Sequence, residues 1–142
     1  MNSRSNIPPF TYERLPSGIH QLNLNAASRE AYEQCFARLE NLFAETSLIE
    51  PLLLLSVVHV FDVQRVSDVW RLSRKLLVHY PRKRPLYNAV VYDSPATFSL
   101  LITAMTQLAS FFGARIYFCK HDELDKAVAW LMDASRDSSS PG

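Results

Sequence analysis

Four histidines and two cysteines are the side chains with which this sequence could carry out nucleophilic, acid–base or metal chemistry. A hydrolase needs a nucleophile, a base and an orienting acid close together, whereas His20, His59, His79 and His121 fall in separate predicted elements. The three glycines form neither a Gly-x-Ser-x-Gly motif nor a glycine-rich phosphate loop. We therefore do not expect an enzyme, and we assign no catalytic residue.

The cysteines and His59 also have ordinary structural interpretations. Cys35 and Cys119 fall in a helical and a strand pattern, without the clustered spacing of a zinc or redox site. We expect both to be buried free thiols, as in a reducing cytoplasm. His59 falls in the central apolar run, where a histidine is more often a hydrogen-bonded core residue than a ligand. The sequence therefore predicts no metal site and no cofactor.

A polar turn after this central run is the first place to look for function. Residues 52–60 carry no formal charge, are rich in Leu and Val, and are bounded by Pro51 and Asp62. Such a run is typical of a strand buried on both faces of a parallel sheet. Ligands and partners of such sheets bind at the carboxyl ends of the strands. The candidate binding residues are therefore Asp62, Val63, Gln64, Arg65 and Ser67, with Asp93 and Ser94 on the neighbouring turn; the family resemblance given below implies that they bind a protein partner.

The elements that position this turn follow from hydrophobic periodicity. Two alternating runs around Gly18 predict a β-hairpin, and apolar residues spaced by three and four predict helices. In order, the chain predicts strands over 10–15 and 19–24, a helix over 29–45, a strand over 52–60, a helix over 66–80, a strand over 86–92, a helix over 96–112, a strand over 114–119 and a helix over 122–133. This alternation indicates an α/β fold with one mixed, mostly parallel sheet of about five strands and four helices.

Two of these helices lead to specific expectations. Trp70 lies on the apolar stripe of the helix over 66–80, and its truncation to Ala should cost about 3–5 kcal/mol. The helix over 96–112 has no charged residue and more apolar side chains than one stripe against a sheet can hide. We expect a second copy of the chain to cover the remainder as a two-fold dimer. Leu100 and Leu101 lie about 100° apart, so one of them belongs to that interface.

Length and charge place the chain in a broad class. Its 142 residues suit one domain, expected over 10–133, between a disordered N-terminus (1–9) and a disordered tail (134–142). A net charge of +1 excludes a polycationic nucleic-acid binder, and we expect the basic loop Arg82, Lys83 and Arg84 to be solvated. Residues 1–9 are polar and carry no apolar signal core, and no apolar run reaches the roughly 18 residues of a membrane span. We expect a soluble, cytoplasmic protein.

The order of elements and two local patterns resemble the bacterial SpoIIAA-like and STAS domains (sulfate transporters and anti-sigma factor antagonists). One pattern is the polar turn Val-Phe-Asp-Val-Gln-Arg-Val at 60–66. The other is Arg-Ile-Tyr-Phe at 115–118, followed by acidic residues and Ala-Val-Ala-Trp-Leu at 127–131. The resemblance covers residues 10–131. It implies a small, non-enzymatic regulatory domain that binds a protein partner or carries a ligand.

In the antagonist branch, a partner kinase phosphorylates a Ser or Thr that follows an Asp at a helix N-terminus, a position that favours an anion. Asp62 matches that Asp, but Val63 and Gln64 stand where the hydroxyls should be, and Ser67 is expected to be an unmodified helix-face serine. The resemblance therefore implies an interaction module without the usual phospho-acceptor. The alternative is a carrier of a small apolar ligand or lipid, held between the helix over 96–112 and the sheet. An enzyme is the third choice.

Overall fold

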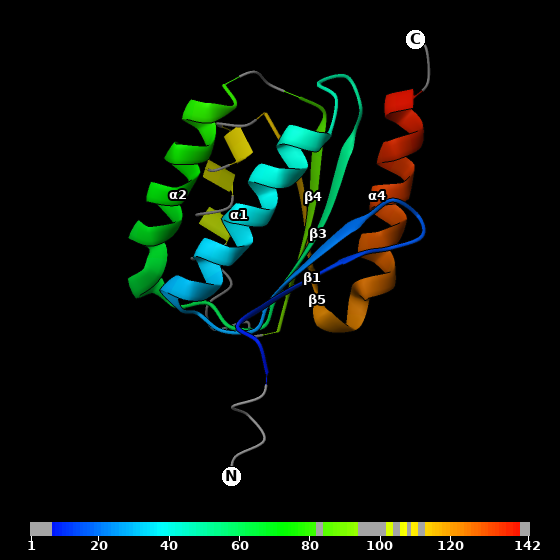
Figure 1. The fold of residues 1–142 in the computed structure, drawn as a ribbon. Helices are drawn as coiled ribbons and strands as arrows, with labels where there is room; N and C mark the ends of the chain where they lie inside the picture. Colours follow the sequence, from blue (N-terminus) through cyan, green and yellow to red (C-terminus); the bar gives the residue numbers. More distant parts are fainter. Residues whose placement is uncertain are drawn as a thin grey trace.

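The computed structural model describes residues 7–81, 84–93, 102–103, 106–107, 109–110 and 113–139. The strands are β1 (Phe10–Arg14), β2 (His20–Leu24), β3 (Leu52–Val58), β4 (Leu86–Tyr92) and β5 (Arg115–Lys120). The helices are α1 (Arg29–Glu45), α2 (Val66–His79) and α4 (Leu124–Ser139), with the short 3₁₀ turns η2 (Val63–Arg65) and η4 (His121–Glu123). The sheet lies between α1 and α2 on one face and α4 on the other (Figure 1).

The five strands lie side by side in the order of the sequence, β1-β2-β3-β4-β5. β1 runs antiparallel to β2, whereas β2, β3, β4 and β5 are mutually parallel. The predicted mixed, mostly parallel sheet of five strands is therefore confirmed. Because four strands are parallel, their carboxyl ends lie along one edge of the sheet, at the bottom of Figure 1.

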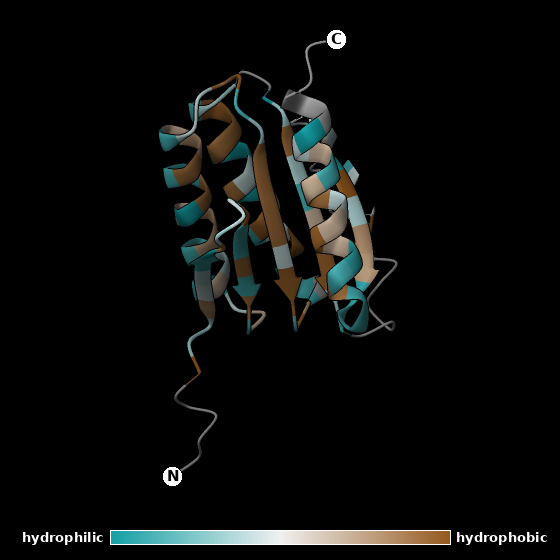
Figure 2. Ribbon diagram, turned by 90° about the vertical axis from the view of Figure 1, so that its right-hand side faces the viewer, coloured by the Kyte–Doolittle hydropathy of each residue, from teal (hydrophilic) through white to brown (hydrophobic). Residues whose placement is uncertain are grey.

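Strand β3 is buried along its whole length and contributes side chains to both faces. Successive side chains of a strand point to opposite faces, so the odd-numbered positions of β3 face α4 and the even-numbered ones face α1 and α2. The core under α4 contains Leu53, Leu55, Val57, Ala127 and Leu131. The core under α1 and α2 contains Leu52, Leu54, Cys35, Phe43 and Leu76. In Figure 2 the middle strands are mostly hydrophobic, while α4 alternates between hydrophobic and hydrophilic residues.

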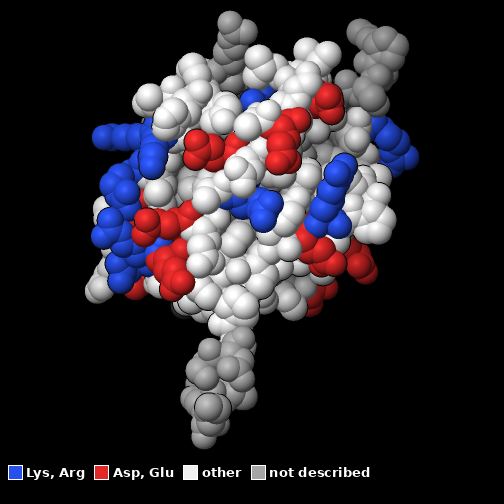
Figure 3. All heavy atoms as spheres, viewed as in Figure 1, with Lys and Arg blue, Asp and Glu red and all other residues white. Residues whose placement is uncertain are grey.

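The helices present mixed charges to solvent. Ser28 caps α1 by accepting a hydrogen bond from the Ala31 backbone N–H at 3.2 Å, a contact that satisfies one of the free donors of the first turn. Figure 3 shows Lys and Arg side chains along the outer side of α2, with Asp and Glu side chains beside them and over α1. No helix among the described residues is both long and apolar enough to cross a membrane.

Several predicted boundaries differ from the structure. β3 ends at Val58, so His59 and Val60 lie beyond the strand, and Val60 is 46% exposed. The last helix does not stop at residue 133, because Ala134 is buried and the helical turns continue to Ser139. The predicted tail therefore begins too early. Of the helix expected over 96–112, the described residues 102–103, 106–107 and 109–110 are helical.

The buried face of α2 is also rotated from the predicted one. The buried residues of this helix are Val69, Leu72, Ser73 and Leu76. Trp70 is only half-buried and packs at the side of the small cluster formed by Tyr32, Val69 and Leu72. Trp70 follows the buried Val69 by about 100° of helical rotation, which turns its ring toward the helix flank. The expectation that Trp70 lies in the core is therefore wrong.

Candidate metal centre

Three residues that could hold a metal ion follow the carboxyl ends of three adjacent parallel strands. Val58 pairs with Tyr92 across β3 and β4, and Tyr92 pairs with Lys120 across β4 and β5. The next residue on each strand is His59, Asp93 or His121. These three residues therefore continue one row of the sheet register. They also share its α4 face, because side chains alternate along a strand.

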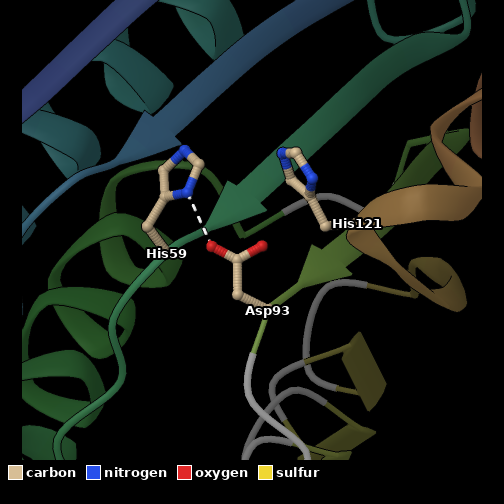
Figure 4. Close-up of side chains that lie close together, drawn as sticks. All are labelled: His59, Asp93 and His121. Carbon is tan, nitrogen blue, oxygen red and sulfur yellow. Dashed lines mark hydrogen bonds and ion pairs between the residues drawn. The ribbon is translucent and has the colours of Figure 1, made fainter.

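The side chains converge in this row (Figure 4). His59 Nδ1 lies 2.8 Å from Asp93 Oδ2, within hydrogen-bond distance. The rings of His59 and His121 are tilted by 51° with their centroids 5.7 Å apart. One donor atom from each of the three residues lies within 4.8 Å of the other two. Two imidazoles and one carboxylate thus face a common point.

Backbone contacts hold two of these residues in place. The His59 backbone N–H donates to the Leu24 carbonyl at 3.0 Å, so β2 continues to support the chain just after β3 ends. On the other side, the Lys120 N–H donates to Glu123 Oε1 at 3.5 Å, across the turn that carries His121. A hydrogen bond from Lys126, first among several causes, lowers the pKa of Glu123, so this carboxylate stays ionised and can keep its two partners.

The cluster can also exchange ligands with solvent. The side chains of His59 and Asp93 are 36% and 38% exposed, and His121 is exposed. Two histidines and a carboxylate are the protein ligands of several zinc enzymes and of the facial triad that binds iron. Three protein ligands leave at least one coordination position open, so a bound ion here could accept a further ligand from solvent or from another molecule.

The distances are close to those that a tetrahedral ion imposes. Zinc–ligand bonds of about 2.0–2.1 Å place the ligand atoms about 3.3 Å apart and two coordinated rings about 5 Å apart. The ring centroids therefore need to approach by less than about 1 Å. The donor atoms lie within 4.8 Å of one another, so no pair needs to close by more than about 1.5 Å. Rotation of exposed side chains is sufficient for such a change, because their rotamers interconvert freely.

The turn predicted as the partner site forms a separate unit at the same edge. The Asp62 carboxylate accepts the Gln64 backbone N–H at 2.9 Å, and its carbonyl accepts the Arg65 N–H at 2.9 Å. Arg65 in turn lies 3.4 Å from Asp68. Gln64 and Ser67 are exposed. Among the predicted partner residues whose side chains the structure describes, only Asp93 joins the histidine cluster.

Other predicted residues lie outside the described part of the chain or have a different role. Ser94, Leu100, Leu101, Arg82, Lys83 and the side chain of Val63 are not among the described groups. Arg84 is only 7% exposed, which contradicts the expected solvated loop. Its guanidinium lies 4.5 Å from the centre of the Phe43 ring and donates to the Thr46 carbonyl at 3.3 Å. Because α1 ends there, Arg84 stabilises the negative end of that helix.

Sequence reasoning missed His59 and His121 for an identifiable reason. The central strand was predicted to extend to residue 60, which placed His59 inside the core. His59 and His121 were therefore assigned to separate elements and were not expected to lie close together. The available signal was the row itself: each of the three residues directly follows an apolar strand of a parallel sheet. If the parallel strands are aligned by their last residues, Val58, Tyr92 and Lys120, the residues that follow them are His59, Asp93 and His121.

Comparison with family models, with curated proteins and with solved structures found no match to this chain.

Proposed function

We propose that this chain is a non-enzymatic binding module that holds a divalent transition-metal ion at the carboxyl edge of its sheet. The observation that carries the proposal is the convergence of His59, Asp93 and His121 from three adjacent strands, with donor atoms within 4.8 Å. Residues 34 and 28 positions apart in the sequence have no local reason to meet. The sheet register brings them together on one face.

The donor set favours zinc or a similar ion over magnesium or calcium. Imidazole nitrogen suits zinc, nickel, copper and iron, whereas magnesium and calcium prefer oxygen ligands. In the metal-bound form His59 Nδ1 would release its proton and exchange the Asp93 hydrogen bond for coordination, because a ligating nitrogen needs its lone pair. Asp93 would supply the negative charge that partly balances the ion.

Isothermal titration calorimetry with zinc tests this proposal on the metal-free protein. We expect one ion per chain and a loss of affinity of at least about 100-fold in His59→Ala, His121→Ala and Asp93→Asn, since each variant removes a ligand. The matched control is His79→Ala, which removes an exposed histidine of α2 that lies outside the cluster. Magnesium should give no heat of binding at this site.

Two results would contradict the assignment. Zinc affinity that stays the same in His59→Ala and His121→Ala would mean that the ion binds elsewhere. A loss of only 10- to 100-fold in Asp93→Asn, with full loss in the histidine variants, would instead make Asp93 a residue that orients His59 rather than a ligand, a typical magnitude for such a change. Circular dichroism should show all variants folded, because the substituted side chains are at least partly exposed.

The same edge is the surface on which a protein partner would dock. Support comes from Val60, an apolar side chain 46% exposed between the metal cluster and the Asp62 turn, and from the exposed Gln64 and Ser67 beside it. An ion with an open position could take its last ligand from that partner. The SpoIIAA-like resemblance agrees with this reading, and the dimer through Leu100 or Leu101 stays a prediction.

Affinity purification with two matched variants tests the docking surface. Val60→Lys places a charge at the proposed surface, whereas Val78→Lys makes the same change on α2 at a side chain that is 77% exposed. A partner that docks at the carboxyl edge should be lost from Val60→Lys and retained by Val78→Lys. Equal recovery with both variants would place the partner on another surface.

A further inference from the structure

A cavity of about 90 Å³ lies on the other face of the same strands, between the sheet and helices α1 and α2. Its walls are apolar almost throughout, and the main lining residues are Leu22, Leu54, Val58, Phe36, Leu39 and Val69. Leu24, Phe61 and Val66 also line it, and these half-buried residues lie at the carboxyl edge.

Tyr32 of α1 places a hydroxyl in this cavity that donates no hydrogen bond to a described residue. Its side chain is 97% buried (3% exposed) and lines the cavity. No described residue accepts a hydrogen bond from its hydroxyl, although the Asp62 backbone lies close enough to interact with the hydroxyl oxygen. Burial, and after it the nearby Asp62 carboxylate, raises the pKa of Tyr32 to about 12. The hydroxyl therefore keeps its proton at neutral pH and is available as a donor.

The sheet contributes two further polar side chains to the same cavity. Ser56 of β3 donates its hydroxyl to Asn88 Oδ1 of β4 at 2.8 Å, and both residues line the cavity. Both stand at inward-facing positions that are apolar elsewhere along these strands. Because the pair satisfies itself, it lowers the cost of burying two polar groups and leaves the Asn88 amide N–H groups free of this contact.

We propose that this cavity binds a small, compact apolar molecule, no larger than a single aromatic ring, with one oxygen that accepts a hydrogen bond from the Tyr32 hydroxyl. The volume sets the upper limit of ligand size. At about 90 Å³ the cavity is smaller than the engineered apolar cavity of about 150 Å³ that accommodates benzene, and far smaller than the roughly 300–1,000 Å³ of drug-sized ligands, so a ring enters only if the half-buried Phe61 and Val66 move apart. An acyl chain is therefore too large for the space that the structure shows.

Water is a poor occupant for the same reasons. A buried water needs two to four polar partners. The polar groups here are the Tyr32 hydroxyl and the Ser56–Asn88 pair, which already share a hydrogen bond, and the rest of the lining is hydrocarbon. Leaving the Tyr32 O–H without an acceptor is also unfavourable, since an unsatisfied buried donor loses its hydration. A ring with one acceptor fills the apolar space and satisfies the hydroxyl together. Such a ligand is distinct from the metal ion, which would bind on the opposite face of the sheet.

A titration with phenol and toluene tests this proposal, because the two probes have nearly the same shape and only phenol has an oxygen. Methyl resonances of Val58, Val66 and Val69 in ¹³C-labelled protein report on the cavity. We expect phenol to bind about three- to tenfold more tightly than toluene, the range of one neutral hydrogen bond. In Tyr32→Phe this preference should vanish, with toluene affinity kept. Tyr80→Phe, which removes a hydroxyl away from the cavity, should behave as the wild type.

The alternatives give different readouts. If neither probe shifts these resonances at millimolar concentration, the cavity holds water or stays empty and the proposal is overturned. If the two probes bind equally in the wild type, or if phenol keeps its advantage in Tyr32→Phe, Tyr32 does not recognise the ligand and the proposal is overturned as well. Tyr32→Phe should remain folded, because it removes an unpaired polar atom without changing the ring.

Discussion

The two faces of the sheet are built from the same strands, yet they differ in the side chains that β3 and β4 bury on them. Under α4, the odd positions of β3 and the facing residues Ala89, Val91 and Leu131 form an apolar cluster. Under α1 and α2, Ser56 and Asn88 take inward positions, and a cavity remains beside them. A continuous apolar run therefore does not fix what a face does.

This contrast suggests where stability and binding reside. Native interiors pack to nearly crystalline density, so a void beside a buried polar pair is an exception. The α4 face accordingly carries much of the packing stability, while the α1–α2 face combines packing with space for a ligand. The substitutions below test this division, starting with the largest expected loss.

Leu131→Ala should give the largest loss of the four experiments. Leu131 is fully buried against the sheet under α4, so its truncation should lower the free energy of unfolding by about 2–5 kcal/mol. Urea denaturation measures this loss. Val78→Ala, at an exposed position of α2, is the control and should change stability by less than about 0.5 kcal/mol. A loss under about 1 kcal/mol for Leu131→Ala would mean that the α4 face is not closely packed.

Ser56→Ala should cost about 1–2 kcal/mol, because it leaves the Asn88 side-chain oxygen without its 2.8 Å donor. Replacing both groups, as in Ser56→Ala with Asn88→Leu, should recover part of that loss, since two apolar groups need no hydrogen bond. Denaturant unfolding of both single variants and the double variant gives the coupling energy. Additive losses would show that the pair does not interact in solution.

Trp70→Ala should lower stability by about 1–2 kcal/mol, less than the 3–5 kcal/mol typical of a fully buried aromatic residue. The reason is that Trp70 lies beside its cluster and not within it. Denaturant unfolding measures this loss as well. A loss of about 3–5 kcal/mol would instead show that Trp70 is a core residue and that the buried face of α2 includes it.

The two thiols should show the smallest effect, namely no measurable labelling of the native protein. Burial raises the pKa of Cys35 to about 12 and also raises the pKa of Cys119, so little thiolate exists at pH 8. Iodoacetamide labelling, followed by peptide mass spectrometry, should modify both residues only in denaturant. Because Cys35 lines the cavity and Cys119 lies under α4, selective native labelling of Cys35 would show that the cavity opens to solvent.

Periodicity predicted the class of the fold and most of its elements, because both strand and helix patterns are local. The hairpin, the helix Arg29–Glu45 and the strand Leu86–Tyr92 appear where the sequence places them. The most important error was the end of the central strand. The prediction extended it two residues beyond Val58, which placed His59 in the core. Arg84 was misjudged because its partners, Phe43 and Thr46, are distant in the sequence. The cavity could not be predicted, because a void depends on how side chains meet in space.

The sequential strand order has a consequence for synthesis on the ribosome. Domains fold as the chain emerges from its N-terminus, and here each new strand pairs with the strand made just before it. The sheet can therefore grow by one strand at a time, with α1 and α2 covering their face as they appear. The opposite face has to wait for α4, which follows β5. Until then Leu53, Leu55 and Val57 lack their cover, so the nascent chain has its greatest need of a chaperone late in synthesis.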